Sequence, residues 1–175
     1  AGFDALVPVE CSTFWDMSIV RGAFPGRAWR DDQFRSGYAE AFGGPVRARV
    51  VAALNRLEAL RYSRDPGWNE SLCRAVREAV DVPLLLEGGV RSRERADALL
   101  GGDDPACDMV GMGRPFYAEP RLPARLLNGG RAACRSCNNC VVPQVTGAPG
   151  VCRTPSVLAR RGEYEAAGAY ENERS

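Results

Sequence analysis

Short apolar runs that end in glycine alternate with helical segments along the second half of the chain. The runs "VPLLLEGGV" (82–90) and "CDMVGMGRP" (107–115) have the unbroken apolar character of strands buried on both faces. Helical patterns are found over 69–80, 92–100 and 120–130. Such alternation is typical of parallel βα units, in which helices cover a sheet or a barrel closes. The chain is therefore predicted to have an α/β fold.

Two of these helical patterns carry start signals. Asn69 precedes a pattern that places Leu72, Val76 and Val80 on one face, and Ser92 precedes the next. Asn and Ser side chains accept hydrogen bonds from the first free amides of a helix. Both residues are therefore expected to be N-caps.

The first half of the chain has a weaker pattern. Residues 3–9 ("FDALVPV") are expected to form a buried strand. Residues 12–66 are interpreted as an inserted loop or lid that carries its own packed helix. Val50, Leu54 and Leu57 fall at helical spacing in this helix and are expected to form its packed face.

Composition divides the chain into three parts. Residues 1–130 contain the βα pattern, 131–155 contain a cysteine cluster, and 156–175 form a polar tail. The tail is expected to be a terminal helix with a frayed end.

Charge and hydropathy exclude several classes of function. The 175 residues are 45% apolar and 26% charged, with a net charge of +1. No broad basic field indicates nucleic acid, and no apolar run approaches the length of a membrane span. No secretory leader pattern is present, so a cytoplasmic protein is expected. The opening "AGFDALVPVE" has no Met and is typical of a helix end that runs into a strand, so we expect the C-terminal part of a longer protein.

Two glycine turns stand where a strand ends and a helix is expected to begin. They contribute Gly88, Gly89 and Val90 from one turn and Gly113 and Arg114 from the other. Glycine allows backbone amides to approach a ligand closely, and the start of a helix favours anions. The pattern predicts a phosphate site to which arginine adds a charge-assisted contact. Alternatively, the glycines only make tight βα turns.

Four cysteines fall within nineteen positions. Cys134, Cys137, Cys140 and Cys152 have the spacing C-x2-C-x2-C-x11-C. In a reducing compartment such spacing favours a metal or redox site over disulfides, and the odd total of seven cysteines points the same way. An iron–sulfur cluster, a zinc site and unmetallated thiols remain open at this point. The other three cysteines are expected to be small buried residues: Cys11, Cys73 and Cys107.

Residues 80–130 resemble the last two βα units of the old yellow enzyme family of NADH:flavin oxidoreductases. The similarity is carried by the Gly-Gly turn, the Gly-Arg-Pro turn and a stretch after them. The matching residues of that stretch are Glu119, Pro120, Leu122, Pro123 and Leu126. The resemblance implies the C-terminal portion of a (β/α)8 TIM barrel, about strands six to eight, in which the two turns hold the phosphate of FMN.

The cysteine spacing is similar to that of family members resembling 2,4-dienoyl-CoA reductase and trimethylamine dehydrogenase. In those members, four cysteines just after the barrel ligate a [4Fe-4S] cluster. The resemblance implies the same role for Cys134, Cys137, Cys140 and Cys152, with zinc as the alternative.

The implied function is that of an FMN-dependent, ene-reductase-like oxidoreductase. NAD(P)H would be the reductant and an activated alkene or similar small molecule the substrate. The chain has no histidine, although the family binds substrate with a His/His or His/Asn pair. Catalytic residues are therefore expected upstream of Ala1, in the missing barrel half. The alternatives are another phosphate-binding barrel enzyme and a non-catalytic or truncated metal-binding fragment.

Overall fold

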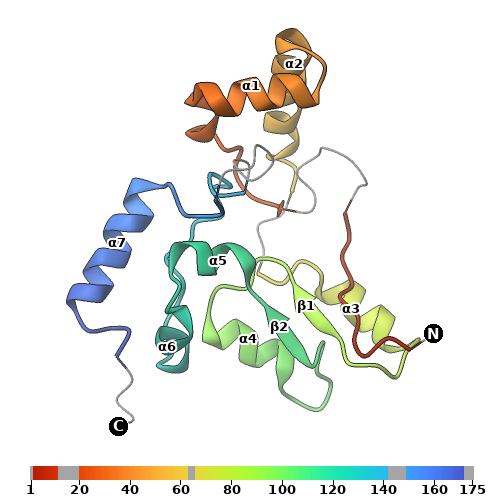
Figure 1. The fold of residues 1–175 in the computed structure, drawn as a ribbon. Helices are drawn as coiled ribbons and strands as arrows, with labels where there is room; N and C mark the ends of the chain where they lie inside the picture. Colours follow the sequence, from red (N-terminus) through yellow and green to blue (C-terminus); the bar gives the residue numbers. More distant parts are fainter. Residues whose placement is uncertain (1, 12–19, 63–65, 142–148, 172–175) are drawn as a thin grey trace.

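The computed structural model describes residues 2–11, 20–62, 66–141 and 149–171. In these ranges the protein is a mixed α/β structure with a two-stranded parallel sheet and seven α-helices (Figure 1). The elements in chain order are η2 (Ala28–Arg30), α1 (Asp32–Ala41), α2 (Pro45–Glu58), α3 (Glu70–Arg77), β1 (Leu85–Glu87), α4 (Arg93–Leu100), β2 (Met109–Gly111), α5 (Gly113–Ala118), α6 (Leu122–Leu127) and α7 (Pro155–Ala166).

The sheet forms where the sequence predicts two strands, but the predicted burial on both faces is wrong: of the strand residues only Leu86 is buried, and Met109 is 42% exposed. β1 and β2 are parallel, and their register pairs Leu86 with Val110. The opening segment joins β1 through a single parallel bridge between Leu6 and Leu84. The predicted buried strand over 3–9 is therefore wrong in extent and in burial. Pro8 has no N–H to donate to a ladder, and Phe3 and Val7 are 66% and 48% exposed.

The main core lies between the sheet and the helices that flank it, α3 and α4 (Figure 1). Its members are apolar or small, and they come from α3, both ends of β1, α4 and the turn before β2. The buried residues are Cys73, Leu84, Leu86, Val90, Leu99, Ala106 and Cys107. Val76 and Val80 pack against this core, although α3 ends at Arg77 and the helix predicted over 69–80 is therefore too long.

The two predicted N-caps have different outcomes. The Ser92 hydroxyl accepts a hydrogen bond from the Arg95 amide at 3.3 Å, so the cap of α4 is confirmed. Asn69 precedes α3 but makes no cap hydrogen bond. Its amide group instead donates to the Glu87 carbonyl at 2.7 Å and accepts from the Glu10 amide at 3.3 Å. The side chain thus ties the end of β1 to the opening segment.

The inserted region forms a helical hairpin, α1 and α2, at the top of Figure 1. Aromatic side chains hold its base, where the Trp29 ring lies 5.9 Å from Phe34 and 5.3 Å from Tyr38. The Asn55 amide reaches across from α2 and donates to the Tyr38 hydroxyl at 2.8 Å. The two helices are therefore held together by side chains of α1 and by the aromatic residues that precede α1 in the chain.

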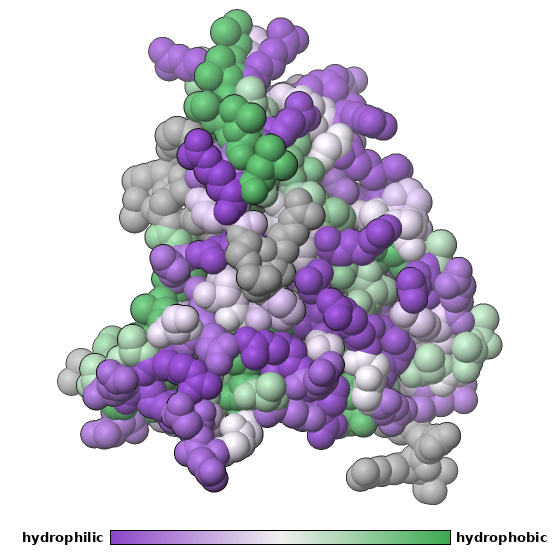
Figure 2. Space-filling model, turned by 180° about the vertical axis from the view of Figure 1, so that it is seen from behind, coloured by the Kyte–Doolittle hydropathy of each residue, from purple (hydrophilic) through white to green (hydrophobic). Residues whose placement is uncertain are grey.

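The expected packed face of α2 is wrong. Val50, Leu54 and Leu57 are 56%, 50% and 61% exposed, and an apolar surface is visible at the top of Figure 2. The helix packs through its small residues instead, since Ala48 and Ala52 are buried. Periodicity identifies an apolar face but not the element that covers it.

The remaining helices position the site. α6 ends before paired glycines as predicted, and the helix expected in the tail is α7. α5, which begins at Gly113, was not predicted. Two paired strands do not establish a barrel, so the TIM barrel remains a prediction. Within the described ranges, every helix is too short or too polar to cross a bilayer.

Candidate functional site

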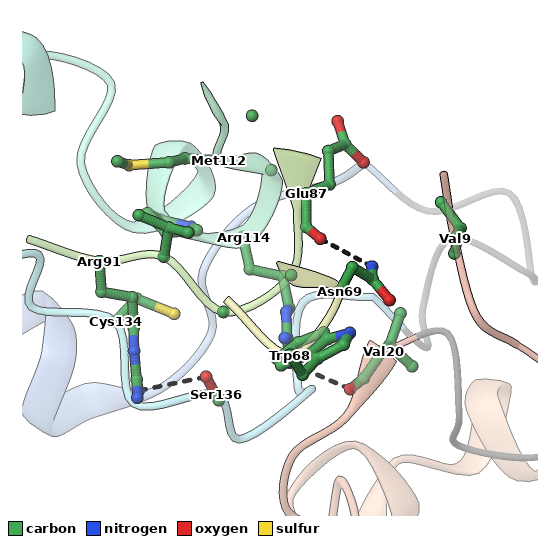
Figure 3. A pocket seen from close by; sticks show the side chains of 16 residues that line it. Val9, Val20, Trp68, Asn69, Glu87, Arg91, Met112, Arg114, Cys134 and Ser136 are labelled. Carbon is green, nitrogen blue, oxygen red and sulfur yellow. Dashed lines mark hydrogen bonds between the residues drawn. The ribbon is translucent and has the colours of Figure 1, made fainter. Parts of the chain in front are cut away.

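The two glycine turns meet at one cavity. The five residues predicted to hold a phosphate all line a cavity of about 200 Å3 at the carboxyl ends of β1 and β2 (Figure 3). They are Gly88, Gly89, Val90, Gly113 and Arg114. The carboxyl ends of parallel strands lie at the same edge of a sheet. Glu87 at the end of β1 pairs with Gly111 at the end of β2, so the turns that follow them converge although these two residues are 24 positions apart in the sequence. Below, this cavity is called the turn pocket.

Free backbone donors surround the turn pocket. Gly88 and Gly89 have φ angles of 134° and 75°, which L-residues with side chains rarely adopt. Within the described residues, the amides of Gly89 and Val90 have no protein acceptor. Gly113 and Arg114 begin α5, so their amides lack acceptors within the helix. Unpaired donors near a cavity are suited to an anion.

Trp68 explains why the first glycine is required. A Cβ added at Gly88 would lie 2.9 Å from the Trp68 indole nitrogen. Trp68 also lines the turn pocket and lies below the centre of Figure 3. Sequence reasoning missed it, because nothing in "DPGWNE" indicates contact with a turn twenty residues later.

Arg114 lies at the turn pocket, but its guanidinium serves other acceptors. It donates to the carbonyls of Val20 at 3.1 Å and Arg21 at 3.0 Å, and to the Asn138 side chain. Burial lowers the pKa of Arg114 from its ordinary value. Three of the five N–H groups of an arginine are thereby used. Arg114 therefore links the turn pocket to the inserted region and the cysteine loop.

The cysteine loop 134–140 is held in an unusual backbone conformation. Ser136 and Asn138 have φ angles of 51° and 58°, in the left-handed region that few non-glycine residues occupy. The side-chain amide nitrogen of Asn138 donates to the carbonyls of Val20 at 2.9 Å and Ala23 at 3.1 Å. One residue with a strained backbone thus lies between each two successive cysteines of the loop. The hydrogen bonds of Asn138 fix this conformation.

The four cysteines of the predicted metal site line one small void. Cys134, Cys137, Cys140 and Cys152 surround a volume of about 10 Å3 beside α7. Among the described residues, however, no three Cys, His, Asp or Glu side chains are arranged to hold a metal ion. The void has room for one water at most, so a cluster requires the loop to open outward. The donor set fits a thiolate-bound cluster, and the metal site remains a prediction.

Burial favours the protonated thiol at two of the four cysteines, Cys134 and Cys140. Burial, followed by the neighbouring Cys134 and Cys137, raises the pKa of Cys140 to about 11. Burial also raises the pKa of Cys134, against the opposing effect of the Ser136 amide. Metals bind thiolates, so binding here must displace protons.

The other three cysteines were expected to be buried. Cys73 and Cys107 are buried in the main core, and burial raises the pKa of each thiol. Cys11 is exposed, so the expectation is wrong there. Cys11 follows the opening segment. Among the described residues this segment forms one bridge to the sheet, so little of its surface is buried.

A buried ion pair positions the start of the cysteine loop. Glu119 is fully buried, and one carboxylate oxygen accepts from the Arg125 guanidinium at 2.8 Å and the Tyr170 hydroxyl at 2.7 Å. The other oxygen accepts from the Ala133 amide, next to Cys134. Burial and the hydrogen bond to Glu119 raise the pKa of Tyr170. The carboxylate thus joins α5, α6, the chain after α7 and the cysteine loop.

Comparison with known proteins gives partial matches of two kinds. The chain is 26% identical over 91 residues to a protein named NADH oxidase from Thermoanaerobacter brockii, covering 52% of this chain and 13% of that protein. It is 33% identical over 67 residues to a bilirubin reductase from Mediterraneibacter gnavus, covering 38% and 10%. It is also 41% identical over 66 residues to a phosphoribosyl imidazole-carboxamide isomerase from Synechococcus, covering 35% and 26%.

These matches cover only part of each chain. The protein spans 13% or less of the two oxidoreductases. No family model matches the sequence, and no solved structure matches it. The names of two of these relatives, NADH oxidase and bilirubin reductase, are those of redox enzymes.

Proposed function

We propose that the protein is part of an FMN-dependent NAD(P)H oxidoreductase of the old yellow enzyme type, with the FMN phosphate in the turn pocket. The proposal rests on one observation above all. Residues from two separate turns line one cavity, beside which the amides of Gly89 and Val90 have no acceptor among the described residues. The similarity to a named NADH oxidase supports a redox role.

The cysteine loop is proposed to hold a [4Fe-4S] cluster. Cys134 lines both the turn pocket and the void shared by the four cysteines, so a cluster there would adjoin the flavin site. When bound, FMN supplies hydride chemistry and the cluster supplies one-electron transfer. The residues of this chain anchor the phosphate, orient the loop through Asn138 and Arg114, and separate the two sites.

A second candidate is a sugar-phosphate isomerase of the barrel type. It is favoured by the similarity to the phosphoribosyl isomerase. The turn pocket would then hold a substrate phosphate in place of FMN. The cysteine loop has no role in this candidate.

FMN titration distinguishes the two candidates. We expect FMN fluorescence to be quenched when the protein is added, and Gly89→Val to weaken binding because a side chain obstructs the amides. Gly102→Val is the matched control, since Gly102 has a similar φ of 82° in the loop between α4 and β2. Equal loss of FMN affinity in both variants, or no FMN binding with tight binding of ribose 5-phosphate, would contradict the flavin assignment.

A further inference from the structure

Four arginines line a groove beside the cysteine loop. The groove has a volume of about 740 Å3 and is lined by 131–135, by α7 residues and by Arg91. Two of its lining residues, Arg91 and Cys134, also line the turn pocket. The arginines are Arg91, Arg131, Arg135 and Arg160. Glu163 is the one acidic residue in its lining. We call it the arginine groove.

Among the described residues, the positive charge of the groove lining exceeds its negative charge, since four arginines face one Glu163. In the described part of the chain, none of its four arginines forms an ion pair, although nine such pairs are found elsewhere. The chain as a whole carries a net charge of only +1, so the excess is local. A concave site lined by one sign of charge concentrates ions of the opposite sign.

The backbone fixes two of the arginines beside each other. Ser92 and Arg131 form an antiparallel bridge, and the Ala132 amide donates to the Arg91 carbonyl at 2.7 Å. The Arg91 guanidinium donates to the Ser136 hydroxyl at 3.2 Å, as Figure 3 shows, while its buried Nε has no hydrogen-bond partner. Burial, together with the nearby Arg131, lowers the pKa of Arg91. Two guanidinium groups of the same charge therefore lie near each other, and one of them has a donor without a hydrogen-bond partner. Such an arrangement favours the binding of an anion.

The size and lining of the groove indicate the class of ligand. Its volume lies within the range of small-molecule sites and exceeds what one phosphate fills. Ala132, Ala133 and the ring of Tyr164 supply less polar surface beside the arginines. Two guanidinium groups lie near the ring, that of Arg125 at 3.7 Å and that of Arg160 at 5.7 Å from its centroid. We propose that the arginine groove binds a nucleoside diphosphate, with the arginines on the phosphates and the nucleoside towards Tyr164.

The arginine groove adjoins the proposed flavin site, with which it shares the lining residues Arg91 and Cys134, but its test does not depend on FMN. ADP, inorganic pyrophosphate and an oligoglutamate peptide are titrated into the protein by calorimetry. We expect ADP to bind more tightly than pyrophosphate, and its affinity to fall with added salt. Saturating FMN and the variant Gly89→Val should leave ADP affinity unchanged.

Charge-removing variants locate the binding. Arg131→Gln and Arg135→Gln change exposed residues, and each should weaken ADP binding about 10-fold, as expected for loss of a charged hydrogen bond. Arg49→Gln on α2 removes the same charge outside the groove and should change affinity less than about 2-fold. Absence of ADP binding, or equal loss in the control, overturns the site. Equal affinity for pyrophosphate overturns the nucleoside assignment, and peptide binding without ADP binding overturns the small-molecule class.

Discussion

Replacing Glu119 with alanine should destabilise the protein severely. Glu119 is 0% exposed and Arg125 is 7% exposed, so their ion pair is buried. Glu119→Ala leaves the Arg125 guanidinium without its carboxylate and removes the acceptor of the Tyr170 hydroxyl and the Ala133 amide. Breaking a buried pair from one side costs about 3–5 kcal/mol, from a total that is normally about 5–15 kcal/mol. The stacking of Arg125 on Tyr164 remains and favours the lower end of that range.

Urea unfolding followed by circular dichroism measures this loss as a change in the free energy of unfolding. Glu78→Ala is the matched control, because Glu78 is exposed and its removal should cost less than about 0.5 kcal/mol. If Glu119→Ala does not fold, Tyr170→Phe removes one hydrogen bond to the carboxylate and should cost about 1.5–3 kcal/mol. A loss below about 1 kcal/mol for Glu119→Ala would refute the reasoning.

Two further predictions concern the sheet and the cysteine loop. The carboxylate of Asp108 accepts from the Leu84 amide at 2.8 Å and the Arg77 guanidinium at 2.9 Å, and these contacts lower its pKa below 3.8. This stabilisation is complete above the pKa of the unfolded state and is lost as pH falls through the pKa of the folded state. Asp108→Asn should therefore make the free energy of unfolding, measured with urea, depend less on pH below pH 3.8. Gly22→Ala would place a Cβ 2.2 Å from the Ser136 carbonyl oxygen and should cost about 1–3 kcal/mol by the same assay. An acid limb as steep as that of the wild type, or an unchanged stability of Gly22→Ala, would contradict these contacts.

The sequence predicts the elements that have local signals. α4 begins after the Ser92 cap, and α6 ends before paired glycines, because these signals act within a few residues of the helix. α1 was missed, although Phe34, Tyr38 and Phe42 recur at intervals of four. The ring centroids of Phe34 and Tyr38 lie 5.5 Å apart, and those of Tyr38 and Phe42 lie 4.6 Å apart. The glycine-rich surroundings concealed this pattern.

The arrangement of the site depends on contacts that the sequence does not show. The turn pocket was predictable because parallel strands end at a common edge. The arginine groove was not, because Arg91, Arg131 and Arg160 come from distant segments and only the fold gathers them. The nearly neutral composition concealed the local charge.

The iron content of the protein tests the central claim most directly. After anaerobic reconstitution with iron and sulfide, we expect about four iron atoms per chain and a brown colour that dithionite bleaches. Cys140→Ser removes one of the four proposed ligands and should lose or degrade the cluster, while Cys73→Ser in the main core is the matched control. A colourless protein that holds one stoichiometric zinc ion, or equal iron content in Cys140→Ser and the wild type, would contradict the account.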